Sequence, residues 1–118
     1  MVVGEDGRVF ASGNNGRGQL GTSDNQNRPA PTHVSGLTAP VRQVAAGKQH
    51  TGIVTEAGDL LMCGDGSFGR LGLGDEDERM WPALVARALF DGEAVLMVAC
   101  GYDHTVVATE GGGVYTFG

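Results

Sequence analysis

Glu56-Ala57-Gly58-Asp59-Leu60-Leu61 decides the fold, because the same pattern recurs on both sides of it. It stands 51 residues earlier as Glu5-Asp6-Gly7-Arg8-Val9-Phe10 and 54 residues later as Glu110-Gly111-Gly112-Gly113-Val114-Tyr115. With the shift of 51, residues 3–34 and 54–85 share 11 identities in 32 positions, and with the shift of 54, residues 41–64 and 95–118 share 10 in 24. A period this long, in a chain with 21 glycines among 118 residues, predicts a β-propeller or a related array of β-repeats.

The segments between the glycine turns have the length and composition of short strands. We expect strands over 41–46, 51–55 and 60–63, and a weaker fourth strand near 32–34 and again near 83–85. The Glu-x-Gly turns between strands need a residue with positive φ, so this conformation is predicted for Gly58 and for Gly7 or its neighbour. Residues 82–90 also have a helix-forming composition, so a helix there remains an alternative.

Charge and cysteine content exclude several classes of function. The formal net charge is −6, which argues against direct binding to nucleic acid or to an anionic membrane. The sequence shows no long apolar run and no secretory leader, so a cytoplasmic or nuclear protein with reduced thiols is expected. Cys63 and Cys100 are too few for a four-ligand zinc site, and they align with Ser12 and Ala46, so we predict buried free thiols.

Two longer motifs repeat together with these turns. The first copy consists of Gly16-Arg17-Gly18-Gln19-Leu20-Gly21, then Asp24, Arg28 and Pro31, then Val44-Ala45-Ala46-Gly47-Lys48-Gln49-His50-Thr51. The second consists of Phe68-Gly69-Arg70-Leu71-Gly72, then Asp75, Arg79 and Pro82, then Val98-Ala99-Cys100-Gly101-Tyr102-Asp103-His104-Thr105. This combined spacing resembles the regulator of chromosome condensation repeat, and the resemblance covers essentially the whole chain.

The resemblance implies an all-β fold, in which such repeats form a seven-bladed propeller with four-stranded antiparallel blades. Residues 1–118 would then be one partial propeller domain of about two blades, with repeat units near 1–51 and 52–105 and the start of a third at 106–118. Because two blades cannot close such a ring, we expect a fragment of a longer protein, or a chain that associates with itself through open blade edges.

The residues give little support to catalysis or cofactor binding. Residues 16–21 and 64–69 match a dinucleotide-binding glycine pattern, but loop sequences follow them where that motif needs a helix. His50 and His104 occupy the same position of the repeat, so both are predicted to hydrogen-bond the backbone of the scaffold. No catalytic triad spacing is present, and we expect neither an enzyme nor a bound cofactor or metal.

Function is expected where the repeats differ, because scaffold positions recur. The candidate partner-binding residues are Trp81, Phe68, Tyr102, Asp103, Asp75, Glu76, Asp77 and Glu78. Aromatic residues on loops are frequent interface anchors, although core packing remains an alternative for Phe68 and Trp81. The acidic run 75–78 has three alternative interpretations: a solvated loop, a surface for a basic partner, or a weak calcium site.

Two functions follow from these observations. The first is a non-enzymatic protein-interaction scaffold that binds a protein partner through its loops. The second, implied by the resemblance alone, is a fragment of a guanine-nucleotide exchange factor for a Ran-type small GTPase. Asp103 resembles the position where such factors place an acidic contact to the GTPase. The photoreceptor members of the family use clustered tryptophans, and the single Trp81 argues against that branch.

Overall fold

The computed structural model describes residues 1–37 and 39–118, and these residues form three antiparallel sheets. The first sheet contains β1 (Val2–Val3), β2 (Val9–Gly13) and β3 (Arg28–His33). The second contains β4 (Val41–Ala46), β5 (His50–Thr55), β6 (Leu60–Gly64) and β7 (Arg79–Leu84). The third contains β8 (Val95–Cys100), β9 (Thr105–Thr109) and β10 (Val114–Phe117). Two short 3₁₀ segments, η1 (Ser67–Gly69) and η2 (Arg87–Phe90), lie in the connections.

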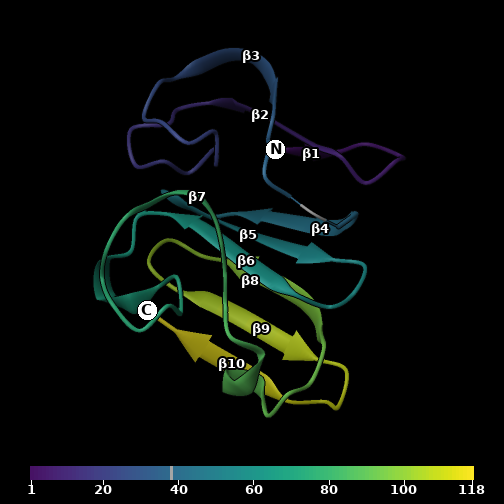
Figure 1. Ribbon diagram of the computed structural model, residues 1–118. Helices are drawn as coiled ribbons and strands as arrows, with labels where there is room; N and C mark the ends of the chain where they lie inside the picture. The colour runs from purple at the N-terminus through teal and green to yellow at the C-terminus, as the bar shows by residue number, and fades with distance from the viewer. Residues whose placement is uncertain (38) are drawn as a thin grey trace.

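The sheets stack face to face along the chain, from the N-terminal sheet at the top of Figure 1 to the C-terminal sheet at the bottom. The middle sheet has the order β4-β5-β6-β7, a four-stranded meander with the architecture of one propeller blade. Its strand β4 lies in the expected first repeat unit (1–51), β5 crosses the boundary at residue 51, and β6 and β7 lie in the expected second unit (52–105). The all-β prediction is confirmed, and the strands are distributed as three, four and three among the sheets.

The expected strands over 41–46, 51–55 and 60–63 are confirmed as β4, β5 and β6. The weak fourth strand begins earlier than expected, because β3 starts at Arg28 and β7 at Arg79, and both strands end just before the predicted Val34 and Val85. The helix alternative over 82–90 is wrong for most of that segment. Leu84 pairs with Leu61 in the sheet, and only 87–90 form a 3₁₀ turn, which buries Phe90.

The glycine turns have the predicted backbone geometry. Gly7 has φ +80° and Gly58 has φ +87°, in the left-handed region that favours glycine. A Cβ atom on Gly58 would lie 2.5 Å from the Cβ of Ala94, so this turn also packs closely against the chain that leads into β8.

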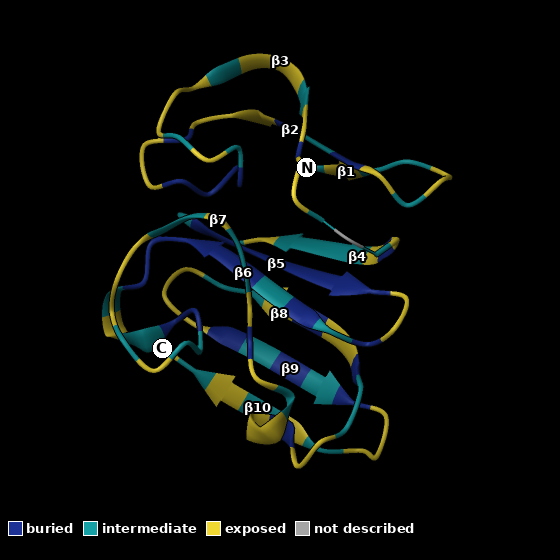
Figure 2. Ribbon diagram, in the orientation of Figure 1, coloured by how far each residue is buried: buried dark blue, intermediate teal, exposed yellow. Residues whose placement is uncertain are grey.

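Two apolar cores fill the spaces between the sheets. The first core includes Val9, Val41 and Ile53, and lies between the first and second sheets. The second core includes Val54, Met62, Val98 and Val107, and lies between the second and third sheets. β5 contributes to both cores because successive side chains point to opposite faces of a sheet, and Figure 2 shows this strand buried along its length.

Candidate functional site

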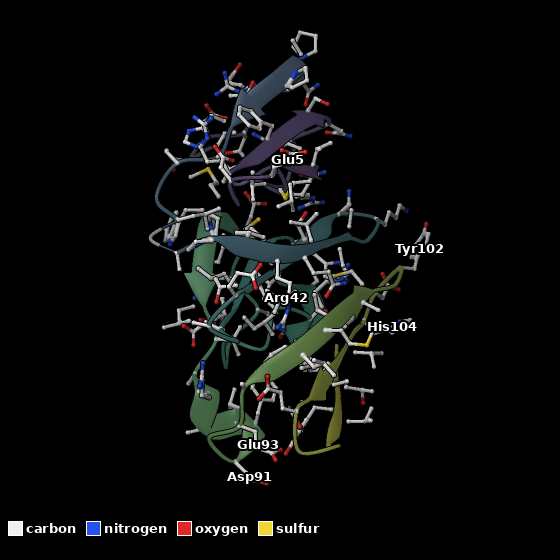
Figure 3. All side chains as sticks on the ribbon, turned by 90° about the vertical axis from the view of Figure 1, so that its right-hand side faces the viewer. Glu5, Arg42, Asp91, Glu93, Tyr102 and His104 are labelled. Carbon is white, nitrogen blue, oxygen red and sulfur yellow. The ribbon has the colours of Figure 1, made fainter. Side chains whose placement is uncertain are left out.

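The strand order brings two kinds of connection to the same end of each sheet. In an antiparallel meander, the link from first to second strand and the link from third to fourth strand lie at one end. This end carries residues 14–27, 47–49, 65–78 and 101–104, which we call the loop face. The short turns at 4–8, 56–59 and 110–113 lie at the other end, which we call the turn face. Figure 3 shows Tyr102 and His104 near one end of β8 and Glu93 and Asp91 near the other.

The structure places seven of the eight candidate residues on the loop face, in the 65–78 and 101–104 connections. The eighth, Trp81, lies in β7 and is 50% exposed. Phe68 is 69% exposed in η1, with φ +62°, and its ring lies over the guanidinium of Arg70 at 5.7 Å. The core-packing alternative is therefore wrong for Phe68, and Trp81 shows half of its surface to solvent.

The carboxylates of the acidic run contact different partners rather than converge on one point. Asp75 accepts a hydrogen bond from Arg79 at 2.9 Å, and this bond, with a backbone N–H, holds the pKa of Asp75 below its usual value. Glu76 accepts the backbone N–H of Phe68 at 2.8 Å. Glu78 accepts from the Asn25 amide at 3.0 Å and so ties this loop to the loop of the first repeat. The calcium alternative thus finds no support within the described residues.

Arg70 is a site residue that the sequence comparison overlooked. It is buried, and one guanidinium nitrogen lies 3.4 Å from a carboxylate oxygen of Asp65 and 3.4 Å from one of Asp103. Its Nε donates to the carbonyl oxygen of Ser67 at 2.8 Å. Arg70 stands where the first repeat has Gln19. The sequence signal that singled out Phe68 and Asp103, a residue that differs between the repeats, was therefore also present at Arg70.

Tyr102 is fixed by the neighbouring sheet. The Lys48 ammonium lies 4.1 Å from the centre of the Tyr102 ring and also contacts the phenol oxygen. The side chain remains 62% exposed despite this contact. The 47–49 and 101–104 loops, which belong to two different sheets, therefore present Tyr102 as a part of one surface.

The predicted scaffold role of His50 is confirmed. Its Nε2 lies 3.2 Å from the carbonyl oxygen of His104 and 3.0 Å from the hydroxyl oxygen of Thr105. That hydroxyl donates its own proton to the carbonyl of Arg70, so both partners of Nε2 are acceptors and Nε2 carries the proton. The ring links the second and third sheets. His104 itself is exposed, and its scaffold role stays a prediction.

The cysteines and the glycine pattern show no sign of reactivity. Cys63 is fully buried, and burial raises the pKa of its thiol to about 12. Cys100 is free as predicted but only half-buried rather than buried, and burial raises the pKa of its thiol to about 11. Thiols of this kind are poor nucleophiles. Residues 16–21 form turns, and the segment that ends the 64–69 pattern is the three-residue η1, so neither glycine pattern opens a helix.

Comparison with known families identifies the repeat. The family model described as regulator of chromosome condensation (RCC1) repeat matches residues 6–54 and 57–108, and a second model of this repeat matches residues 41–70. The chain belongs to this family. The resemblance drawn from the paired motifs is thereby confirmed.

Known proteins resemble this chain both in sequence and in structure. The ultraviolet-B receptor UVR8 of Arabidopsis thaliana is 40% identical over the whole chain. The structure of human WBSCR16 superposes with a TM-score of 0.80 at 28% identity, over 92% of the chain. Prp20p of Saccharomyces cerevisiae superposes with a TM-score of 0.79 at 22% identity, over 89% of the chain. The chain therefore folds as part of a β-propeller.

The chain is much shorter than these relatives. It spans 27% of the length of UVR8, 28% of WBSCR16 and 27% of Prp20p. Among the residues that the structure describes, none of the helices is long and apolar enough to cross a membrane.

Proposed function

We propose that this chain is a protein-interaction module that binds a protein partner through the loop face. The observation that carries the proposal is that two aromatic side chains of this face, Phe68 and Tyr102, are mostly exposed while a cation lies against each ring. Such rings offer a large contact area with little further loss of conformational entropy on binding. Within the described residues, the site offers this surface rather than a catalytic constellation.

Selective capture of partners tests the proposal. The full chain is immobilised and exposed to a cell extract beside two variants: the loop-face variant Phe68→Ala/Tyr102→Ala and the turn-face variant Glu56→Ala/Glu110→Ala. Proteins bound specifically should be recovered by the wild type and by the turn-face variant and lost from the loop-face variant. Equal recovery by all three chains would refute a role for the loop face.

A second candidate is a fragment of an exchange factor for a Ran-type small GTPase. The observation that favours it is the Asp103 carboxylate, which remains 58% exposed on the loop face although it lies close to Arg70. The solved structure of Prp20p concerns a protein studied for its binding to Gsp1p and to histones. The likeness to Prp20p supports the fold alone, and a nuclear or cytoplasmic site of action fits either candidate.

Release of a fluorescent guanine nucleotide from a purified Ran-type GTPase tests this second candidate. The full chain should accelerate release, and Asp103→Asn should reduce the acceleration. A chain that binds partners through the loop face and leaves the release rate unchanged would be a scaffold without exchange activity.

A further inference from the structure

From the surface around Phe68 we infer that the loop face docks a basic segment of its protein partner, with one arginine or lysine side chain held between the Phe68 ring and the carboxylates of Asp75 and Glu76. This inference rests on the proposed function and names the chemistry of the partner. It follows from the shape of the surface, from its charge, and from a comparison with the equivalent loop of the first repeat.

An open hollow lies beside the Phe68 ring. Phe68, Gly69, Gly74, Asp75 and Glu76 line it, and its volume is about 560 Å³. A Cβ atom on Gly69 or Gly74 would meet no atom of residues 1–37 and 39–118 within 4 Å, so these residues leave the space above the two glycines open. The hollow is large enough to admit a long side chain from another molecule.

The groups that line the hollow suit a cation. An aromatic face attracts ammonium and guanidinium groups, and carboxylates add charge-assisted hydrogen bonds. Glu76 uses one carboxylate oxygen to hold the Phe68 backbone, and its other oxygen has no partner among the described residues. The nearby arginines are already paired with carboxylates. Arg79 pairs with Asp75, and Arg70 pairs with Asp65 and Asp103.

The equivalent loop of the first repeat keeps Asp24 at the position of Asp75, but it lacks the aromatic ring and the carboxylates that follow. Arg17 stands in place of Phe68, and Asn25-Gln26-Asn27 stand in place of Glu76-Asp77-Glu78. Over the aligned 14 residues, the first loop (14–27) carries Arg17 and Asp24, for a net charge of 0. The second loop (65–78) carries five carboxylates and Arg70, for a net charge of −4. A partner with a basic segment is therefore steered toward the second loop rather than the first.

The changes between the two loops depend on one another. In the first loop, the backbone N–H of Arg17 donates to the side chain of Gln19 at 2.8 Å. In the second loop, Glu76 accepts the corresponding N–H of Phe68, because Arg70 occupies the position of Gln19 and turns inward beneath the ring. With Arg70 in place of Gln19, the backbone N–H of Phe68 needs another acceptor. Glu76 is that acceptor, and its carboxylate therefore lies beside the exposed ring.

Peptide binding to the full chain tests the inference. The probes are fluorescein-labelled peptides of alternating glycine and serine with two arginines, with two lysines, or with two glutamates, measured by fluorescence anisotropy at physiological salt. The wild type should bind the arginine and lysine peptides and not the glutamate peptide. Phe68→Arg, which installs the residue of the first repeat, should weaken binding about tenfold, since it replaces a cation–π contact by charge repulsion.

Two further variants separate a specific site from general charge attraction. Glu76→Asn/Asp77→Gln/Glu78→Asn installs the uncharged residues of the first repeat and should also weaken binding about tenfold. Glu5→Gln/Glu56→Asn/Glu110→Gln removes the same number of charges at the turn face and should change affinity less than about twofold. Phe68→Tyr keeps the aromatic ring and should retain wild-type affinity. Circular dichroism confirms that each variant is folded.

The outcomes distinguish this inference from the proposed function. Equal weakening by both triple variants, or no binding of either basic peptide by the wild type, overturns the inference. If the loop-face variant Phe68→Ala/Tyr102→Ala still loses its captured partners in that case, the proposed function stands with a partner of another chemistry. If the loop-face variant captures the same partners as the wild type, both the inference and the proposed function are refuted.

Discussion

At the scale of the residue, Gly58 is restricted both by its positive φ and by a close neighbour, whereas Gly112, at the same position of the next repeat, is restricted by its positive φ alone. Gly58 has φ +87° and a would-be Cβ contact of 2.5 Å with Ala94, whereas Gly112 has φ +89° and no atom within 4 Å. Gly58→Val should lower the free energy of unfolding by about 1–3 kcal/mol through backbone strain and the clash. Gly112→Val should cost less, because only the strain applies. Urea unfolding measures both, and equal losses would show that the clash with Ala94 is relieved.

His50 makes the stability of the interface between the second and third sheets depend on pH. Its Nδ1 is buried and has no hydrogen-bond partner among the described residues, and burial lowers the pKa of the ring below 6.5. An unfolded chain takes up this proton near pH 6.5, while the folded chain resists it, so stability should fall as pH drops from about 7.5 to 5.5.

Urea unfolding at these two pH values measures the effect, which one proton limits to about 1.4 kcal/mol per pH unit. The variant His50→Gln keeps a donor at this position and cannot titrate, so its stability should change less over the same range. A wild-type chain that becomes more stable toward pH 5.5 would contradict a folded-state pKa of His50 that burial has lowered.

Sequence reasoning succeeded for single residues whose role is local or repeated. Gly58 was predicted from its turn, and His50 from its recurrence in the repeat. Arg70 was missed because its meaning depends on Asp103, which is 33 positions along the chain and belongs to the next sheet. A side chain of this type is normally exposed, and only the fold shows that this one is buried between carboxylates.

At the scale of the elements, β4 and β8 are joined by side chains rather than by a ladder. Gln43 donates to the carbonyl oxygen of Val98 at 2.7 Å and accepts the backbone N–H of Val98 at 3.0 Å. Arg42 donates to the carbonyl oxygens of Val95 and Leu96, each at 2.9 Å, and lies between the two strands in Figure 3. These contacts pair backbone groups at the edge of β8, which is an outer strand of the third sheet.

Gln43→Met should therefore destabilise the chain by about 1–3 kcal/mol, since it leaves the N–H and the carbonyl of Val98 unpaired. Methionine is the residue at the same position of the next repeat, Met97, so the strand itself tolerates it. The matched reverse change Met97→Gln, at a residue that is 52% exposed, should be close to neutral. Thermal and urea unfolding compare the two, and similar losses would argue against this contact.

Strands with a regular apolar pattern were predictable, and strands without one were not. β4, β5 and β6 were correctly located because apolar and small residues lie between clear glycine turns. β3 and β7 were placed too late in the chain because they are outer strands with prolines and little alternation, so burial does not mark their start. The composition of 82–90 favours a helix, but pairing of Leu84 with Leu61 overrides that propensity.

At the scale of the whole molecule, the repeat predicted the stacked sheets but not the shape of the loop face. The repeat period and the shared glycines were enough to indicate a propeller. The meeting of the 65–78 and 101–104 loops at Arg70 depends on how two sheets pack, which no spacing encodes. Seven of the eight positions singled out because the repeats differ lie on this face, in the 65–78 and 101–104 loops, and their role in binding stays a prediction.

The outer faces of the first and third sheets predict self-association of the 118-residue chain. Leu60 is 1% exposed in the second core, whereas Val114, at the same position of the next repeat, is 69% exposed on the third sheet. Val2 is 65% exposed on β1, at the edge of the first sheet. These two surfaces differ, so one chain can stack on the next head to tail, as its own sheets stack.

We therefore expect oligomers or irregular aggregates in light scattering at about 50 µM, a concentration at which weak micromolar contacts are filled. Val2→Lys and Val114→Lys alter opposite ends of the stack, and because a head-to-tail contact uses both surfaces, either change alone should shift the chain toward the monomer. A contact between two copies of the same end would instead respond to only one of the two changes. A stable wild-type monomer of 12.2 kDa with cooperative unfolding would show that neither surface needs a partner.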